Sequence, residues 1–360
     1  MNRTLLSVAA ATLISTLAAC GGGGSSDGST TPPAGSMPPV VVAPPVINTS
    51  VDVVSATGTL NATPAASTYA AGSLQASAYA AINVARSGAG AGAMNQAATL
   101  DVSAMAHATY QLTNIAGGLT HFEDATKVDF YAVSPADRMA KAGHAVGYTN
   151  ETISGTSTTG ADYVYGLLDT VYHGAALLSQ ANDIGFAFKM DPNFTSQSLG
   201  VANLASGAGY GQVPAAGALV AYPFNGQAGV FETFYAGNEV PRVSTTLFPN
   251  ATAGTPVIVN VRNADYVNFS AAGTLKAVVT QFVLKDGSGN IVPSTIIGNS
   301  VITGATGVTV NADTNLGEGV VVLVPTSPLL KGQVYTYTFS ATLKTGATVT
   351  TKTAQFTTNP

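Results

Sequence analysis

The side chains best suited to acid–base or metal chemistry are clustered in one half of the chain. Histidine changes charge near neutral pH and is the commonest protein metal ligand. A single histidine is more often a buried, hydrogen-bonded group, so the clustering is the informative feature. No histidine follows residue 173, and the four that the chain has are His107, His121, His144 and His173.

Several familiar catalytic arrangements are excluded by the sequence. The chain has no HExxH helix and no G-x-S-x-G turn, the motifs of zinc proteases and of α/β-hydrolases. Its single cysteine, Cys20, lies far from the histidines, which excludes a Cys-His nucleophile. A Ser-His pair stays open, although no motif marks a particular serine.

The segments around the histidines resemble a known family in order and spacing. The runs are LTHFEDA, SPADRMAKAG, NETISG, YHGAALL, NDIGFAF and YPFNGQ. They resemble bacterial members of the CAP superfamily (cysteine-rich secretory, antigen-five and pathogenesis-related proteins) over about half the chain. Arg138 matches the arginine of a family helix. Asn150-Glu151-Thr152-Ile153 matches the Gly-Glu-Asn-Ile motif only at its glutamate and isoleucine, and YHGAALL lacks the arginine that follows the family histidine.

The resemblance implies a site made of two histidines and two acidic residues in a central cleft. By position it assigns His121, Glu151 and His173 to this cleft. Asp169 is the candidate for the fourth member, because a residue four positions before His173 shares its helix face. An ordinary solvated aspartate is an equally good interpretation of Asp169.

Two functions fit this residue set. His121, His173 and Glu151 could bind zinc, which accepts imidazole and carboxylate ligands and keeps a position open when only three protein groups bind. The same groups could act as general base and acid toward a hydrolysable substrate.

The other polar residues near these segments are expected to have structural roles. His107 lies on the apolar side of its helix in MAHATYQL, which favours a packed, hydrogen-bonded role. We expect His144 in AGHAVGY, and Glu123 and Asp124 next to His121, to lie on surface loops.

Residues 67–242 show a pattern of helices and strands. Apolar stripes predict helices over 74–86, 101–114 and 161–178, and the segments IGFAFK and GALVAYPF are typical of buried strands. Helices flanking a small sheet are expected. The resemblance sharpens this to an α+β domain built as a CAP-like α-β-α sandwich.

Residues 249–360 predict strands only. In QVYTYTFSATL, aromatic and aliphatic residues alternate with Thr and Ser, as a strand with one buried face requires. KAVVTQFVL is followed by DGSGN, a turn typical of hairpins. These short strands predict an all-β immunoglobulin-like sandwich, and the ending resembles the last two strands of bacterial Ig-like modules.

The N-terminus has the pattern of a bacterial lipoprotein. Residues 1–19 are typical of a signal peptide, with Arg3 followed by a short apolar run. Leu17-Ala18-Ala19-Cys20 resembles a lipobox, which implies lipidation at Cys20; an ordinary signal peptide with a chance cysteine is the alternative. Residues 20–66 are Gly/Ser-rich and then Pro-rich, typical of a flexible linker. Gly21 lacks the aspartate of inner-membrane lipoproteins, which favours the outer membrane.

Composition limits the choice of partners. Charged residues make up 9% of the chain and the net charge is −5, with no basic stripe, which argues against nucleic-acid binding. The lipobox pattern and the resemblance to the CAP superfamily together imply a cell-envelope lipoprotein with a non-enzymatic CAP-type module for a lipid, glycan or protein ligand. A metal-assisted hydrolase of peptides or cell-wall material is the alternative. A purely structural histidine cluster is the third interpretation.

Overall fold

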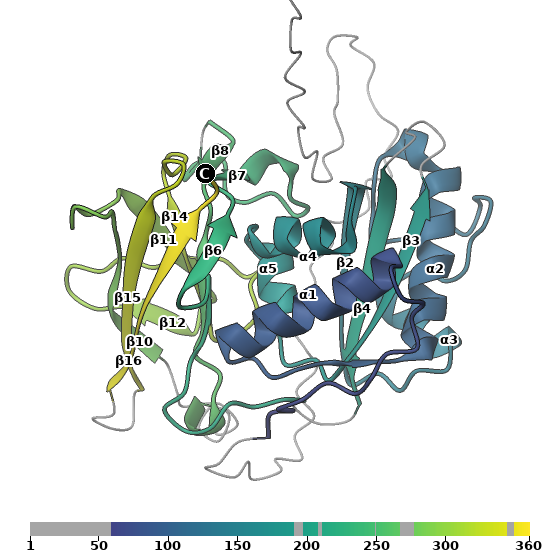
Figure 1. Cartoon of the computed structure of the whole chain (residues 1–360), viewed down its shortest axis with the longest axis horizontal. Helices are drawn as coiled ribbons and strands as arrows, with labels where there is room; N and C mark the ends of the chain where they lie inside the picture. Colours follow the sequence, from purple (N-terminus) through teal and green to yellow (C-terminus); the bar gives the residue numbers. More distant parts are fainter. Residues whose placement is uncertain (1–58, 191–196, 208–210, 249, 267–276, 344–348) are drawn as a thin grey trace, which may run out of the picture.

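The computed structural model describes residues 59–190, 197–207, 211–248, 250–266, 277–343 and 349–360 (Figure 1). The predicted signal peptide, Cys20 and most of the linker lie outside the described residues. Within the described ranges, no helix has the length and apolar character needed to cross a membrane. The chain is mixed α+β, followed by a β-sandwich.

The first part is a four-stranded sheet in the order β1-β3-β4-β2, with helices on both faces. Ser73 caps the first helix, and the capping box of Ser134 and Asp137 begins the third. The strands are β1 (Asn95–Gln96), β2 (Tyr148–Ser157), β3 (Asp183–Met190) and β4 (Ser198–Ser206). The helices are α1 (Leu74–Ala89), α2 (Ala98–Thr113), α3 (Pro135–Lys141), α4 (Gly160–Leu168) and α5 (Tyr172–Leu177).

Strand alternation explains the two layers of helices. Leu199 and Val201 of β4 pack in one cluster with Ala104 and Ala108 of α2. The next residues along β4 face the other way, where α1 and α4 cover the sheet. In Figure 1, α2 lies on one side of the sheet, and α1, α4 and α5 lie between the sheet and the β-sandwich. The helices predicted at 74–86 and 101–114 are confirmed.

The single helix predicted over 161–178 is wrong, because the chain forms two. Asp169 is the C-cap of α4, and α5 begins only at Tyr172. The helix is interrupted by a contact with a distant part of the chain. The buried Glu239 carboxylate accepts hydrogen bonds from three backbone N–H groups, those of Val171, Tyr172 and His173, at 3.1, 2.7 and 3.2 Å. These are N–H groups that a continuous helix would bond internally.

The second part consists of two five-stranded sheets, β12-β10-β15-β16-β6 and β13-β11-β14-β9-β5. The predicted alternation of QVYTYTFSATL is confirmed, with Tyr335, Tyr337 and Phe339 buried in β15. A short pair of strands, β7 (Thr233–Tyr235) and β8 (Thr252–Gly254), lies beside the sheets. The remaining strands are β5 (Val220–Tyr222), β6 (Gln227–Val230), β9 (Val257–Asn260), β10 (Ala277–Lys285), β11 (Ser294–Gly298), β12 (Ile302–Gly304), β13 (Asn311–Ala312), β14 (Val320–Pro325), β15 (Val334–Leu343) and β16 (Val349–Thr358).

The predicted boundary near residue 242 does not separate the two parts. The GALVAYPF segment supplies β5, which pairs with β9 of the sandwich, and β6 pairs with β16. Its assignment to the first domain is therefore wrong. An apolar run shows that a strand is buried but does not show which sheet it joins.

The turn at 286–290 also connects differently from the prediction. Asp286 accepts bonds from the N–H groups of Ser288 and Asn290, as a tight turn requires. However, β10 pairs with β12 and β15, whereas β11 lies in the opposite sheet, and only a single bridge joins Lys285 to Ile291. The turn therefore carries the chain between sheets and closes no regular hairpin.

Both parts share one hydrophobic core. The largest buried cluster includes Val171 and Leu177, at the two ends of α5, together with three residues of the sandwich side, Ile258, Leu316 and Val320. The sandwich has its own interior as well, around Tyr337, Phe339 and Phe356. The common core fixes the orientation of the sandwich relative to α5.

Candidate functional site

The site begins at Glu151, on the edge strand β2. Its Oε1 lies 2.9 Å from Nδ1 of His121, a residue of the loop between α2 and α3. Arg138 of α3 donates from Nη2 to both carboxylate oxygens, at 2.9 and 2.8 Å. The His121 side chain is 24% exposed, whereas Glu151 and Arg138 are buried. One imidazole therefore faces solvent while its carboxylate partner does not.

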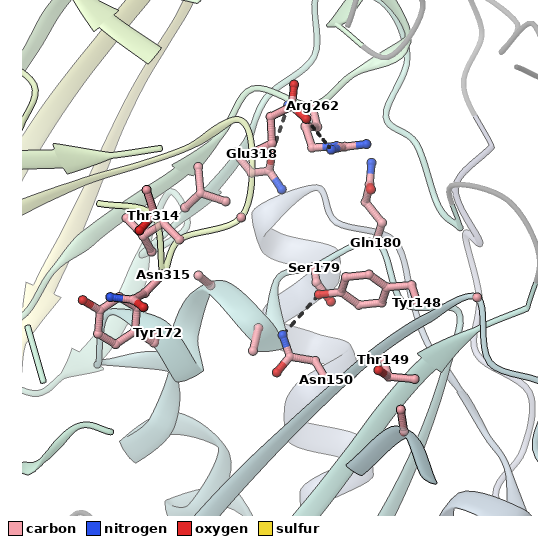
Figure 2. Close-up of a pocket in the computed structure, with 18 of the residues that line it drawn as sticks. Tyr148, Thr149, Asn150, Tyr172, Ser179, Gln180, Arg262, Thr314, Asn315 and Glu318 are labelled. Carbon is pink, nitrogen blue, oxygen red and sulfur yellow. Dashed lines mark hydrogen bonds and ion pairs between the residues drawn. The ribbon is translucent and has the colours of Figure 1, made fainter. Parts of the chain in front are cut away.

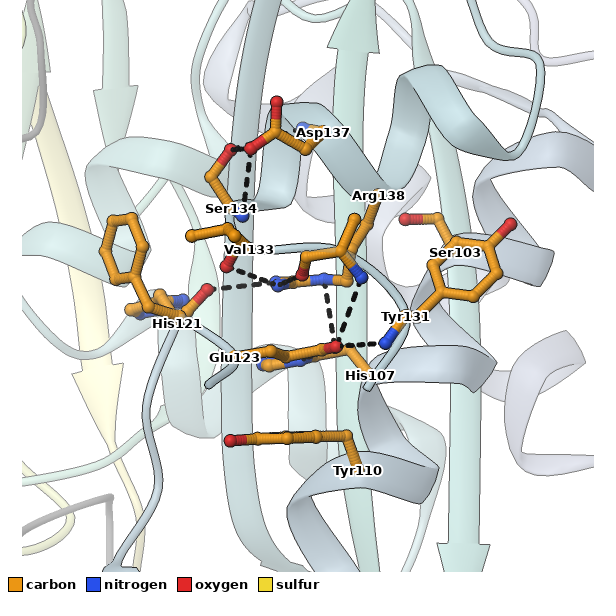
Figure 3. Close-up of polar contacts among 12 residues, drawn as sticks. Ser103, His107, Tyr110, His121, Glu123, Tyr131, Val133, Ser134, Asp137 and Arg138 are labelled. Carbon is orange, nitrogen blue, oxygen red and sulfur yellow. Dashed lines mark hydrogen bonds and ion pairs between the residues drawn. The ribbon is translucent and has the colours of Figure 1, made fainter. Parts of the chain in front are cut away.

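A buried polar network includes His107, Glu123 and Arg138 (Figure 3), and Arg138 connects it to Glu151. His107 of α2 contacts Glu123 through Nδ1 at 2.8 Å and the Thr120 carbonyl through Nε2 at 2.8 Å. Glu123 also accepts a bond from the Tyr131 N–H at 2.6 Å. The packed role predicted for His107 is confirmed. The surface role predicted for Glu123 is wrong, because the residue is 3% exposed and its carboxylate organises this loop. Asp124 is exposed as expected.

The electrostatics keep Glu151 ionised. Burial alone raises the pKa of its carboxyl, but the Arg138 guanidinium, His107 and His121 outweigh burial and hold the pKa well below its usual range. A carboxylate held in this way accepts a proton poorly near neutral pH.

The second histidine is held by a glutamate that sequence reasoning missed. Nδ1 of His173, on α5, lies 3.2 Å from Oε1 of Glu239, which is fully buried. The ring centroids of His121 and His173 are 6.5 Å apart. Glu239 lies in the segment YAGNEVP, 66 residues after His173, and no spacing rule connects the two. The signal that the sequence offered was a glutamate in an otherwise aromatic, weakly charged stretch.

The structure thus brings together His121, Glu151 and His173, but places Asp169 elsewhere. The Asp169 carboxylate accepts bonds from Tyr222 Oη at 2.7 Å and the Phe231 N–H at 3.1 Å, both from the segment that joins the sandwich. Burial raises the pKa of Asp169 to about 7, against the effect of these two hydrogen bonds. The prediction that Asp169 shares a helix face with His173 is wrong, because the helix ends between them.

The predicted zinc ligands do not fit a three-ligand site. Among the described residues, no group of three or more His, Cys, Asp or Glu side chains is arranged to hold a metal ion. Both oxygens of Glu151 already bond Arg138, which accounts for its absence from such a group. What remains is a pair of imidazoles whose Nδ1 atoms contact carboxylates and whose Nε2 atoms make no hydrogen bond within the described part of the chain.

His144 takes no part in this pair. Its Nδ1 lies 2.9 Å from Oγ1 of Thr99, and its Nε2 lies 3.9 Å from Asp183. The residue lies on a loop between exposed neighbours, as expected, but its side chain is only 12% exposed. His144 instead links the start of α2 to the start of β3.

Comparison with known proteins gives little further information. No protein-family model matches the chain, and no curated protein matches it. Among solved structures, the chain is similar to an outer surface protein from Borrelia burgdorferi, with 17% sequence identity and a TM-score of 0.30. The similar region covers 36% of this chain and 88% of that chain. A likeness at this TM-score carries no argument about function.

Proposed function

We propose that this chain is a cell-envelope lipoprotein carrying a CAP-type, non-enzymatic binding module. The ordered motifs of the sequence support the family proposal. So do a sheet with helices on both faces and the meeting of His121, Glu151 and His173. Glu239 takes the place of the fourth member of the site, its second acidic residue. The composition of the C-terminal strands supports an Ig-like type for the sandwich.

The binding proposal rests on one observation, which is that the imidazoles of His121 and His173 each contact a buried glutamate carboxylate. In each, Nδ1 contacts a buried glutamate, which leaves Nε2 to face a ligand. A carboxylate behind the far nitrogen is the usual outer partner of a metal-binding histidine, where it fixes the ring orientation. His121 and His173 would therefore hold a transition-metal ion as two ligands, with the remaining positions taken by water or by a bound partner.

The state of Glu151 favours binding over hydrolysis. A general base works best when its pKa lies near the operating pH. Arg138 and the histidines hold the pKa of Glu151 far below that range. Metal-assisted hydrolysis stays the second candidate, because two protein ligands leave open positions on zinc.

Zinc titration of the purified full-length chain tests the histidine pair. We expect calorimetry to show that the parent chain binds one zinc ion. The double variant, His121→Ala with His173→Ala, should bind zinc with at least tenfold lower affinity. His144→Ala is the matched control, because this histidine lies outside the pair. Equal zinc binding by the parent and the double variant would contradict the proposal. Zinc-dependent cleavage of peptides or cell-wall fragments would favour the second candidate.

The lipoprotein assignment has a separate test. A triacylated cysteine anchors a protein stably, because each buried methylene contributes about 0.8 kcal/mol. We expect Cys20→Ser to move the protein from the membrane fraction to the soluble fraction in fractionated cells. A variant that stays with the membrane would refute anchoring through Cys20.

A further inference from the structure

A cavity of about 360 Å³ lies between the α/β part and the β-sandwich (Figure 2). Its volume is within the range of roughly 300–1,000 Å³ found for small-molecule sites. Neither histidine of the pair lines it. Its polar walls come from the start of β2, the α5 region, the end of β9 and the loop before β14, and include Tyr148, Asn150, Tyr172, Gln180, Arg262 and Glu318.

The charges of the lining residues cancel. The only charged side chains among them are Arg262 and Glu318, which lie 3.8 Å apart as an ion pair. A lining with no net charge gives neither an anion nor a cation an electrostatic advantage. The other polar groups are amides and hydroxyls, which both donate and accept hydrogen bonds. The cavity therefore suits a neutral ligand rich in groups that can both donate and accept hydrogen bonds.

Two lining residues carry buried polar atoms that lack partners. Ser179 Oγ and Gln180 Nε2 are shielded from solvent and make no hydrogen bond with any described residue. Ser179 is only 8% exposed. Buried polar groups in native structures are nearly always bonded, so these two atoms are unsatisfied within the described part of the chain, and rotation of either side chain into the cavity would supply a hydrogen-bonding group to a ligand.

The walls are fixed before any ligand arrives. Tyr172 of α5 donates from its hydroxyl to Asp313, in the loop that precedes β14, at 2.7 Å. Leu316 and Val320, which flank the cavity on the sandwich side, belong to the core shared with α5. A preformed site avoids the entropy cost of ordering its walls during binding.

We propose that this cavity binds a neutral saccharide unit. Sugar hydroxyls match the amides, hydroxyls and the Arg262–Glu318 pair, and the Tyr148 and Tyr172 rings supply apolar surface for the C–H faces of the sugar. The site is completed only where the two parts of the chain meet, so the sandwich forms part of the binding site. This inference is independent of the histidine pair.

Calorimetry of the full-length chain with glucose, N-acetylglucosamine, cellobiose and chitobiose tests the proposal. We expect at least one sugar to bind, with affinity reduced at least tenfold by Gln180→Ala and measurably by Tyr148→Phe, which keeps the ring. The matched control is Gln281→Ala, an exposed glutamine on β10. Pelleting with insoluble chitin and cellulose then shows whether the bound unit belongs to a free sugar or a polymer.

Several outcomes would overturn the proposal. They are the absence of binding by all four sugars, equal affinity of the parent and Gln180→Ala, and preferential binding of the charged sugars glucuronate or glucosamine. Binding of the neutral peptide trialanine in place of sugars would also overturn it. The double histidine variant keeps its sugar binding, which separates this result from the zinc titration.

Discussion

Arg138 is the residue on which the buried acidic groups depend. Its guanidinium contacts Glu151 at 2.8 Å and Glu123 at 3.6 Å, and all three side chains are almost fully buried. A buried charge is tolerated when it is paired and hydrogen-bonded, and breaking such a pair leaves an uncompensated charge. The network therefore positions Glu151, and through it His121.

The substitution Arg138→Met tests this dependence. We expect a loss of ~3–5 kcal/mol in the free energy of unfolding, because two carboxylates lose their counter-charge. Chemical denaturation of the parent and variant measures the loss. Lys127→Met, at an exposed position, is the control and should change the unfolding free energy by less than about 0.5 kcal/mol. A loss of similar size in both variants would contradict the role of Arg138.

The raised pKa of Asp169 predicts that its contribution to the free energy of unfolding falls as the pH rises. A carboxylate in an ordinary ion pair has the opposite effect, because its pKa is lowered on folding. The pKa of Asp169 is raised from 3.8 to about 7 on folding, so between these values the folded chain keeps a proton that the unfolded chain has released. The stability that Asp169 contributes is fully present below pH 3.8 and decreases as the pH rises through about 7.

The variant Asp169→Asn cannot titrate and isolates this effect. We expect the difference in unfolding free energy, variant minus parent, to increase by as much as ~4 kcal/mol between about pH 4 and about pH 7. Denaturation series at several pH values measure the difference. A difference that does not vary with pH would contradict the raised pKa.

At the scale of elements, α5 depends on a carboxylate from a distant segment. Glu239 accepts three backbone N–H bonds at the start of this six-residue helix and also contacts His173. Capping groups stabilise a helix start by about 0.5–2 kcal/mol. Here the cap also separates α5 from α4, so it decides the direction in which His173 points.

We expect Glu239→Ala to loosen the start of α5. Hydrogen exchange at the amides of Val171, Tyr172 and His173 should accelerate by about tenfold or more, because a lost cap of ~1–2 kcal/mol changes local opening by that factor. Glu232→Ala is the control, since the Glu232 carboxylate forms an ion pair with the exposed Lys331 at 3.4 Å and lies away from α5 in the sequence and in its contacts among the described residues. Unchanged exchange at these three amides would show that α5 does not need the cap.

At the scale of the whole molecule, the two parts are joined too closely to act as independent domains. They share a core, β5 and β6 extend the two sheets of the sandwich, and the Asp169 bonds to Tyr222 and Phe231 tie α4 to the same segment. A spacer role for the sandwich would need a smaller and more polar interface.

This architecture predicts a single cooperative unfolding transition. Scanning calorimetry of the full-length chain should give one peak whose calorimetric and van't Hoff enthalpies agree. Two resolved peaks would show that the parts unfold separately. A fragment ending at residue 248 should also fail to fold, because it would leave β5 and β6 without their partner strands.

The sequence by itself determined the local elements. Apolar stripes predicted α1 and α2, and alternation predicted β15, because these patterns depend on neighbours a few residues away. The family resemblance, and not local spacing, selected His121, Glu151 and His173 as candidate site residues. Tertiary structure alone decided the break between α4 and α5, the placement of β5 and β6, and the roles of Glu239 and Asp169. Each of these depends on one long-range contact, such as the Glu239 carboxylate meeting the N–H groups of α5, and no local spacing encodes that contact.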